Sequence, residues 1–143
     1  MLEDPLAKDL WAFASKKMTQ TNQPAKTLLF VGEKQCGKTS LINKFLDQNQ
    51  VKEELQETTA LEFKSGLKLH NDKRVKTNVY ELGGGRNFAG LLEAALSGGN
   101  LLHTTICIVV DLTKPGNSME TLLFWLEAVR EATQAAVQAL SAE

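Results

Sequence analysis

The distribution of apolar residues predicts alternating strands and helices along most of the chain. An apolar run at residues 27–31 precedes a glycine-framed polar loop, and apolar residues then recur at helical spacing up to residue 46. Residues 61–69 and 75–81 alternate between apolar and polar side chains, and the polar segment HNDKR between them is typical of a turn. This part of the chain is therefore expected to form a strand, a helix and a β-hairpin.

The remaining pattern continues the same alternation. Three consecutive glycines at 83–85 end the hairpin, and apolar residues between 88 and 96 recur at helical spacing. The segment TTICIVVD, residues 104–111, is apolar on both faces, which is typical of a central strand covered by helices on each side. After Pro115 and Gly116, apolar residues recur at helical spacing from Met119 to Leu140. The order predicts an α/β fold with a mostly parallel sheet, one antiparallel edge strand and helices on both faces.

Two segments are expected along the chain. Asp4 and Pro5 are typical of a helix start, and apolar residues follow at helical spacing as far as Met18. We expect residues 1–23 to form an amphipathic helix and a linker, with the helix packing on its own domain or binding a partner. Residues 24–143 are expected to form the N-terminal part of one domain, truncated after the helix that follows its fourth strand.

Composition and charge restrict the possible partners. The chain has 143 residues, with 16 basic and 17 acidic side chains and a net charge of -1. This balance gives no general attraction to nucleic acid or anionic membranes. No apolar run approaches the ~20 residues of a membrane span, and Cys36 and Cys107 form neither a disulfide framework nor a metal-binding pattern. We expect a cytoplasmic protein with reduced thiols, no nucleic-acid binding and no direct membrane anchor.

The loop GEKQCGKT, residues 32–39, carries the most specific chemistry in the sequence. Its backbone N–H groups and the positive end of the following helix can converge on phosphates, because Gly32 and Gly37 let the chain wrap closely. Lys38 would reach the β and γ phosphates, and the Thr39 hydroxyl would bind Mg²⁺. The alternative is a glycine loop that only caps a helix. The predicted cofactor-binding residues in this region are Gly32, Lys34, Gln35, Cys36, Gly37, Lys38, Thr39 and Ser40.

The stretch from TTALEF to ELGGG, residues 58–85, resembles the switch I to switch II region of Ras-like and Rab-like GTPases. In this resemblance Thr58, or Thr59 as the alternative, corresponds to the threonine that closes over Mg²⁺ and the γ-phosphate. Glu81 and Gly84 correspond to the acid and the glycine of the DxxG motif. The resemblance implies a metal site of Thr39, Thr58 and Glu81, with the Gly84 N–H on the γ-phosphate. Thr58 taken alone could equally be a threonine that opens a strand.

Three departures from the GTPase pattern concern hydrolysis. Gly85 stands where many Ras-like proteins have a glutamine that orients the attacking water, and Lys34 stands where they usually have a glycine. Glu81 is one methylene longer than the usual aspartate. We therefore predict that the domain binds nucleotide, has no catalytic residue, and turns nucleotide over at or below about 10⁻⁴ s⁻¹.

The loop GEKQCGKTSLINKFL, the motif ELGGG and the strand end VVDLTKP together resemble the light intermediate chain family of cytoplasmic dynein, over roughly residues 4–130. ELGGG and TALEF are more similar to the cytoplasmic dynein 2 branch, the motor of retrograde intraflagellar transport. The resemblance implies a Ras-like P-loop domain in a non-catalytic accessory subunit that binds and stabilises the heavy-chain tail. The implied partners include other dynein subunits and the intraflagellar transport assembly. The implied locations are cytoplasm, cytoskeleton and cilium or flagellum, including axoneme and basal body.

Two other functions remain open on the sequence. A regulatory GTPase of the Rab or Arf kind would bind partners in a nucleotide-dependent way and would need a membrane anchor. A kinase or ATPase would need a second acid, for which Asp111 is the only suitably placed residue; the alternative role of Asp111 is to cap a turn. The predicted cofactor is GTP/GDP or ATP/ADP with Mg²⁺. The sequence does not decide between guanine and adenine, because the base-recognition motif of Ras-like domains would lie beyond Glu143.

Overall fold

The computed structural model describes residues 25–46, 58–70, 73–96 and 101–142. The predicted N-terminal helix of residues 1–23 lies outside this part of the chain. The strands are β1 (Lys26–Gly32), β2 (Leu61–His70), β3 (Lys73–Leu82) and β4 (Thr104–Val109). The helices are α2 (Lys38–Leu46), α3 (Leu92–Leu96) and α4 (Pro115–Ser141), with 3₁₀ segments η1 (Gly85–Leu91) and η2 (Leu101–His103).

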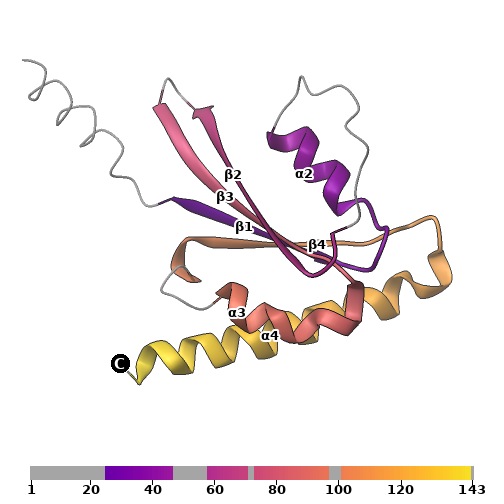
Figure 1. The fold of residues 1–143 in the computed structure, drawn as a ribbon. Helices are drawn as coiled ribbons and strands as arrows, with labels where there is room; N and C mark the ends of the chain where they lie inside the picture. The colour runs from indigo at the N-terminus through magenta and orange to yellow at the C-terminus, as the bar shows by residue number, and fades with distance from the viewer. Residues whose placement is uncertain (1–24, 47–57, 71–72, 97–100, 143) are drawn as a thin grey trace, which may run out of the picture.

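The described strands form one mixed sheet in the order β2-β3-β1-β4. β1 pairs in parallel with both β3 and β4, whereas β2 pairs antiparallel with β3. Helix α2 lies on one face of the sheet, and α3 and α4 lie on the other (Figure 1). The predicted α/β order, the hairpin and its antiparallel edge strand are confirmed in the described residues.

Each face of the sheet has its own hydrophobic core. On the face that carries α3 and α4, fully buried Trp125 packs with Leu29, Val31 and Leu82, among others. On the opposite face, Ile42 of α2 packs against strand residues of β1 and β3. Burial of these side chains on both faces fixes β1 in the middle of the sheet, so that the loop after β1 emerges between the two helical layers.

Among the described strands, residues 104–109 lie at an edge of the sheet, so the prediction of a central strand stays a prediction. β4 pairs only with β1 among the described strands, and it lies at an edge of the sheet with its side chains mostly half-buried. The apolar composition of this segment reflects its contacts with both cores, to which Ile106 and Cys107 respectively belong. The apolar run therefore corresponds to contacts on both faces of the sheet.

Two predicted helices also differ in detail. The segment from Gly85 begins as a 3₁₀ segment with a kink at Phe88, and only Leu92–Leu96 is α-helical. In α4, which starts with Pro115 in its first turn, Met119 and Leu123 are exposed although their spacing suggested a core face. The helix buries another stripe, which contains Thr121, Trp125 and Ala132.

Candidate phosphate-binding site

The loop between β1 and α2, residues 32–39, bends sharply through left-handed backbone conformations. The φ angles of Gly32, Gln35 and Gly37 are 152°, 62° and 95°. A Cβ at Gly37 would meet no atom within 4 Å, so only its backbone conformation requires glycine there. At Gly32 a Cβ would also collide with the carbonyl oxygen of Val109. Left-handed residues interspersed with ordinary ones turn successive backbone N–H groups toward one concavity. Such a concavity is suited to an anion.

Helix α2 presents its N-terminal end to the same concavity. The N–H of Leu41 donates to the carbonyl oxygen of Gly37 at 3.0 Å, which is a helical i to i−4 bond at the start of α2. The amides of Lys38, Thr39 and Ser40 come before this bond, at the positions where a helix leaves N–H groups without partners in the helix. The first turn contains no acidic residue. The positive end of α2 can therefore accept a phosphate.

The Lys38 side chain binds back to the backbone at the start of its own loop. Its side chain is buried, and Nζ donates to the carbonyl oxygens of Gly32 at 3.0 Å and Glu33 at 2.8 Å. The third contact of Nζ is with Cys36 Sγ at 3.7 Å. Because sulfur is a weak acceptor, a phosphate oxygen could replace this third contact while the two carbonyl contacts remain.

Thr39 and Glu81 meet at the base of the concavity. Thr39 Oγ1 donates to Glu81 Oε1 at 2.6 Å, so the longer glutamate side chain reaches the threonine. Glu81 is 3% exposed, and its Oε2 is buried with no hydrogen-bond partner among the described residues. A buried carboxylate oxygen without a partner, beside a hydroxyl, fits a hard cation such as Mg²⁺. The described chain holds no cluster of three or more His, Cys, Asp or Glu, so phosphate and water would supply the other ligands.

Thr58 lies at the same cavity, but its hydroxyl is engaged elsewhere. Thr58 Oγ1 donates to Glu62 Oε2 at 3.0 Å. Thr58 therefore lines the cavity, but its hydroxyl forms no hydrogen bond to Thr39 or Glu81. To bind a metal ion, the Thr58 hydroxyl would have to exchange Glu62 for the metal.

The cavity has a volume of about 210 Å³ and gathers almost all of the predicted site residues. Gly32 does not line it, but contributes the carbonyl oxygen that Lys38 binds. Gly83 lines the cavity although the sequence analysis did not select it. Binding of a cofactor by these residues remains a prediction. The lining residues are Lys34, Gln35, Cys36, Gly37, Lys38, Thr39, Ser40, Thr58, Glu81, Gly83 and Gly84.

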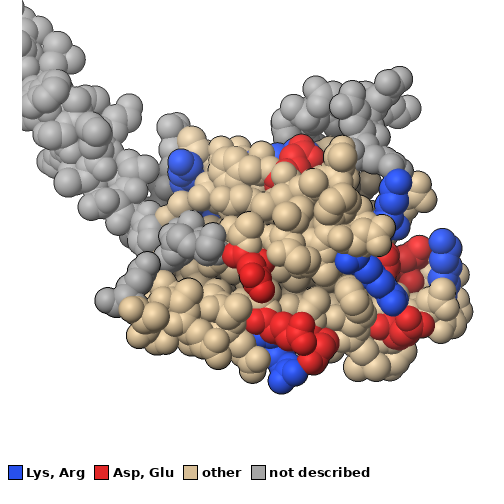
Figure 2. Space-filling view, turned by 60° about the horizontal axis from the view of Figure 1, so that its bottom comes forward, with Lys and Arg blue, Asp and Glu red and all other residues tan. Residues whose placement is uncertain are grey.

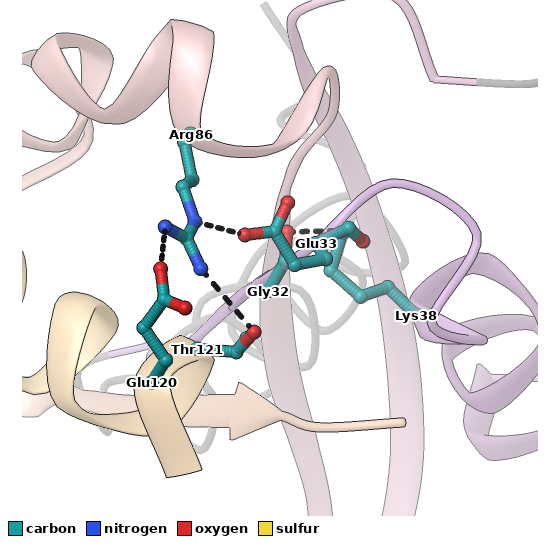
Figure 3. Close-up of polar contacts among 6 residues, drawn as sticks. All are labelled: Gly32, Glu33, Lys38, Arg86, Glu120 and Thr121. Atoms are coloured by element: carbon teal, nitrogen blue, oxygen red, sulfur yellow. Dashed lines mark hydrogen bonds and ion pairs between the residues drawn. The ribbon is translucent and has the colours of Figure 1, made fainter. Parts of the chain in front are cut away.

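Sequence reasoning missed an ion-pair network beside the cavity. Arg86, at the start of η1, contacts Glu33 of the 32–39 loop and Glu120 of α4 (Figure 3). These pairs join residues that are 53 and 34 positions apart. No local pattern in the sequence signals contacts over such separations.

The titratable groups near the cavity have identifiable environments. Burial raises the pKa of the Cys36 thiol, and the nearby Lys38 ammonium opposes this effect without cancelling it. Asp111 Oδ1 accepts hydrogen bonds from the hydroxyl and the N–H of Thr113, at 2.7 and 2.9 Å. These two bonds lower the pKa of Asp111 and confirm that it caps the turn.

The surface charge agrees with the balanced composition. On the face that carries α3 and α4, acidic and basic side chains are interspersed and form no large patch of one sign (Figure 2). None of the helices in the described residues has the length and apolarity needed to cross a membrane.

Comparison with known protein families gives a match to the family model described as dynein light intermediate chain (DLIC), over residues 7–139. The chain belongs to the dynein light intermediate chain family. The match includes the 32–39 loop, the hairpin, the glycine triplet and nearly all of α4.

Individual family members resemble the chain at similar levels. Cytoplasmic dynein 2 light intermediate chain 1 of Danio rerio is 30% identical over 117 residues, covering 80% of this chain and 32% of the relative. The dynein 2 protein of Mus musculus is 33% identical over 107 residues, covering 73% and 30%. Cytoplasmic dynein 1 light intermediate chain 1 of Homo sapiens is 32% identical over 136 residues, covering 90% and 25%. The chain thus spans between a quarter and a third of the length of these relatives.

Proposed function

We propose that this chain is a Ras-like P-loop domain of a dynein accessory subunit, in which a nucleotide and Mg²⁺ serve as a structural cofactor. The observation that supports this most is the convergence of Lys38, Thr39 and Glu81 on one cavity, at the carboxyl ends of β1 and β3. In sheets with parallel strands this edge is where nucleotides bind. The curled 32–39 loop and the free end of α2 provide phosphate donors at the same place.

Each residue has a distinct role in this proposal. Backbone amides of the loop and Lys38 hold the phosphates, while Thr39 and Glu81 hold the metal ion directly or through water. Gly84 offers its N–H to a terminal phosphate. A bound nucleotide stabilises the folded domain by mass action, by about 2.7 kcal/mol at a hundredfold excess over Kd if only the folded state binds. The base is guanine or adenine.

Weak hydrolysis follows from the residues around the terminal phosphate position. Gly85 has no side chain that could orient a water molecule, and it is buried against the 32–39 loop. Lys34, exposed in that loop, stands where Ras-like GTPases usually have glycine. We expect turnover at or below about 10⁻⁴ s⁻¹, as for an unassisted Ras-type GTPase.

The proposed biological role follows the family. We infer that the full-length protein is a non-catalytic subunit that binds the tail of a dynein heavy chain together with other dynein subunits. The motifs ELGGG and TALEF favour cytoplasmic dynein 2, and thus retrograde intraflagellar transport in cilia. Relatives named for dynein 2 and for dynein 1 are about equally similar to the chain, so the motifs carry this choice.

The first experiment identifies the nucleotide. The full-length protein is purified gently in Mg²⁺, denatured, and its released nucleotide is identified by chromatography and mass spectrometry. We expect near-stoichiometric guanine or adenine nucleotide, and its loss in Lys38→Met. Lys44→Met is the matched control, because Lys44 is exposed in the last turn of the same helix. Nucleotide-free protein, or equal nucleotide in both variants, would contradict the proposed site.

The second experiment tests the subunit role and its alternative. Tagged heavy-chain tails of dynein 2 and dynein 1 are co-expressed with the full-length protein, and co-purification is measured with diphosphate or non-hydrolysable triphosphate present. We expect capture by the dynein 2 tail at equal levels with either nucleotide. Capture that depends on the triphosphate would favour a regulatory GTPase, and capture by the dynein 1 tail alone would contradict the assignment to dynein 2.

A further inference from the structure

Arg86 joins three parts of the fold. Its Nε donates to Glu33 Oε1 at 2.5 Å, and its two terminal nitrogens donate to Glu120 Oε1 at 2.9 Å and Thr121 Oγ1 at 3.4 Å. The guanidinium carbon lies 4.9 Å from the centre of the Phe124 ring. The 32–39 loop, η1 and α4 therefore meet at one side chain (Figure 3).

Glu33 extends this network to the candidate phosphate site. Its carboxylate binds Arg86, and its carbonyl oxygen accepts the hydrogen bond from Lys38 Nζ at 2.8 Å. Figure 3 shows Glu33 between the two cationic side chains. A continuous set of polar contacts thus runs from α4 through Arg86 and Glu33 to Lys38.

The loop that precedes Arg86 is already packed against its surroundings. Gly84 and Gly85 have φ angles of 69° and 64°, and an ideal Cβ on Gly85 would lie 3.2 Å from the backbone nitrogen of Lys34. Gly83 N donates to the carbonyl oxygen of Ala60. The 83–85 loop is therefore held from both sides, and Arg86 is the side chain that ties its carboxyl end to α4.

The contacts of Arg86 differ in how strongly they hold its side chain. Glu120 is 71% exposed, so this single ion pair is screened by water. Glu33 and Thr121 are more buried, and the planar guanidinium can bind them while stacking on an aromatic ring. Lysine offers a point charge and cannot satisfy the same set of partners.

We propose that Arg86 is a latch that holds the 83–85 loop in its phosphate-facing position before any nucleotide binds. Arg86 is a positioning residue, because it acts through Glu33 and the glycine loop and touches no phosphate. This proposal rests on the proposed nucleotide site for its effect on binding. In it, the loop keeps one arrangement with a diphosphate or a triphosphate, whereas the switch II segment of a regulatory GTPase orders only with the triphosphate.

The test compares Arg86→Ala and Arg86→Lys with the wild type in the full-length chain. Arg130→Ala is the matched control, because Arg130 pairs with Glu127 within α4 and forms no ion pair or hydrogen bond to another element among the described residues. Hydrogen–deuterium exchange of residues 83–90 is measured without nucleotide. We expect exchange about tenfold faster in Arg86→Ala, an intermediate rate in Arg86→Lys, and the wild-type rate in Arg130→Ala.

The second measurement uses fluorescent diphosphate and non-hydrolysable triphosphate analogues of both guanosine and adenosine. In Arg86→Ala the triphosphate must order the loop on binding, so its affinity should fall about fivefold to tenfold while diphosphate affinity stays within about twofold. Exchange in the wild type should be the same with either nucleotide.

The outcomes separate the latch from the nucleotide site. Unchanged exchange in Arg86→Ala, or an equal increase in Arg130→Ala, overturns the latch. Faster exchange with equal effects on both nucleotides overturns its action on the terminal phosphate. If the wild type binds none of the analogues, the proposed nucleotide function fails, but the exchange of the nucleotide-free proteins still decides whether Arg86 holds the loop.

Discussion

Introducing a glutamine at position 85 tests the reason for the predicted weak hydrolysis. Many Ras-like GTPases have a water-orienting glutamine at the position that Gly85 occupies here. If a missing side chain were the only deficit, Gly85→Gln would accelerate hydrolysis. The structure predicts a different result: the substitution destabilises the domain and does not accelerate hydrolysis, because position 85 has a left-handed backbone conformation and a Cβ there would be crowded by the 32–39 loop.

The magnitude follows from two contributions. Gly85 has a φ angle of 64°, and this conformation costs a residue with a side chain about 1–2 kcal/mol. An ideal Cβ would also lie 2.9 Å from Glu33 Oε2 and 3.2 Å from Lys34 N. The Lys34 nitrogen is backbone and cannot rotate away, and Arg86 holds the Glu33 carboxylate. We therefore expect Gly85→Ala and Gly85→Gln to lower the unfolding free energy by about 1–3 kcal/mol.

The matched control lies five positions away in the same 3₁₀ segment. Gly90 has no positive φ, and a Cβ there would meet no atom within 4 Å. Gly90→Ala should therefore leave stability unchanged or raise it by up to about 1 kcal/mol. Thermal denaturation of the full-length chain measures both, with about 2–4 °C expected for each kcal/mol in a domain of this size. Single-turnover release of γ-phosphate measures hydrolysis.

Two results would refute this reasoning. If Gly85→Gln melts together with the wild type, the loop has room for a side chain and the close contacts do not constrain it. If the same variant hydrolyses the triphosphate faster than the wild type, the missing glutamine was the cause of weak hydrolysis.

Three further predictions test other parts of the domain. Thr39→Val removes the hydroxyl that donates a hydrogen bond to buried Glu81 Oε1, so we expect the unfolding free energy to fall by about 1–3 kcal/mol. In melting curves of this variant, Mg²⁺ should add nothing to the stabilisation by nucleotide. Unchanged melting would count against the metal site. Burial raises the pKa of Cys36 and so lowers its thiolate fraction at neutral pH. In a Cys107→Ser background, iodoacetamide should therefore react more slowly with Cys36 than with a free thiol. The reaction rate is measured as a function of pH, and a rate that reaches its plateau at a pH below the ordinary thiol pKa would disprove this. Trp125→Ala should cost about 3–5 kcal/mol in denaturant titrations, because this fully buried side chain fills the core under α4; a loss below about 1 kcal/mol would be inconsistent with that position.

The sequence by itself determined the local elements and the site loop. Side-chain alternation with a period of two marked both strands of the hairpin, and helical spacing marked α2 and most of α4. Gly32 and Gly37 indicated a loop that needs unusual backbone angles, which the structure has. These features depend on residues within a few positions of one another, so they can be predicted from the sequence alone.

The tertiary structure alone decided the features that join distant segments. The resemblance implied that Glu81 belongs to the metal site, and the packing of β3 beside β1 brings its longer side chain to Thr39. The order of the described strands, with β1 between β3 and β4, also came from the structure. The contacts of Arg86 with Glu33 and with α4 were not anticipated. Such contacts depend on how the sheet and helices pack, because packing, and not spacing along the chain, sets which side chains lie within bonding distance.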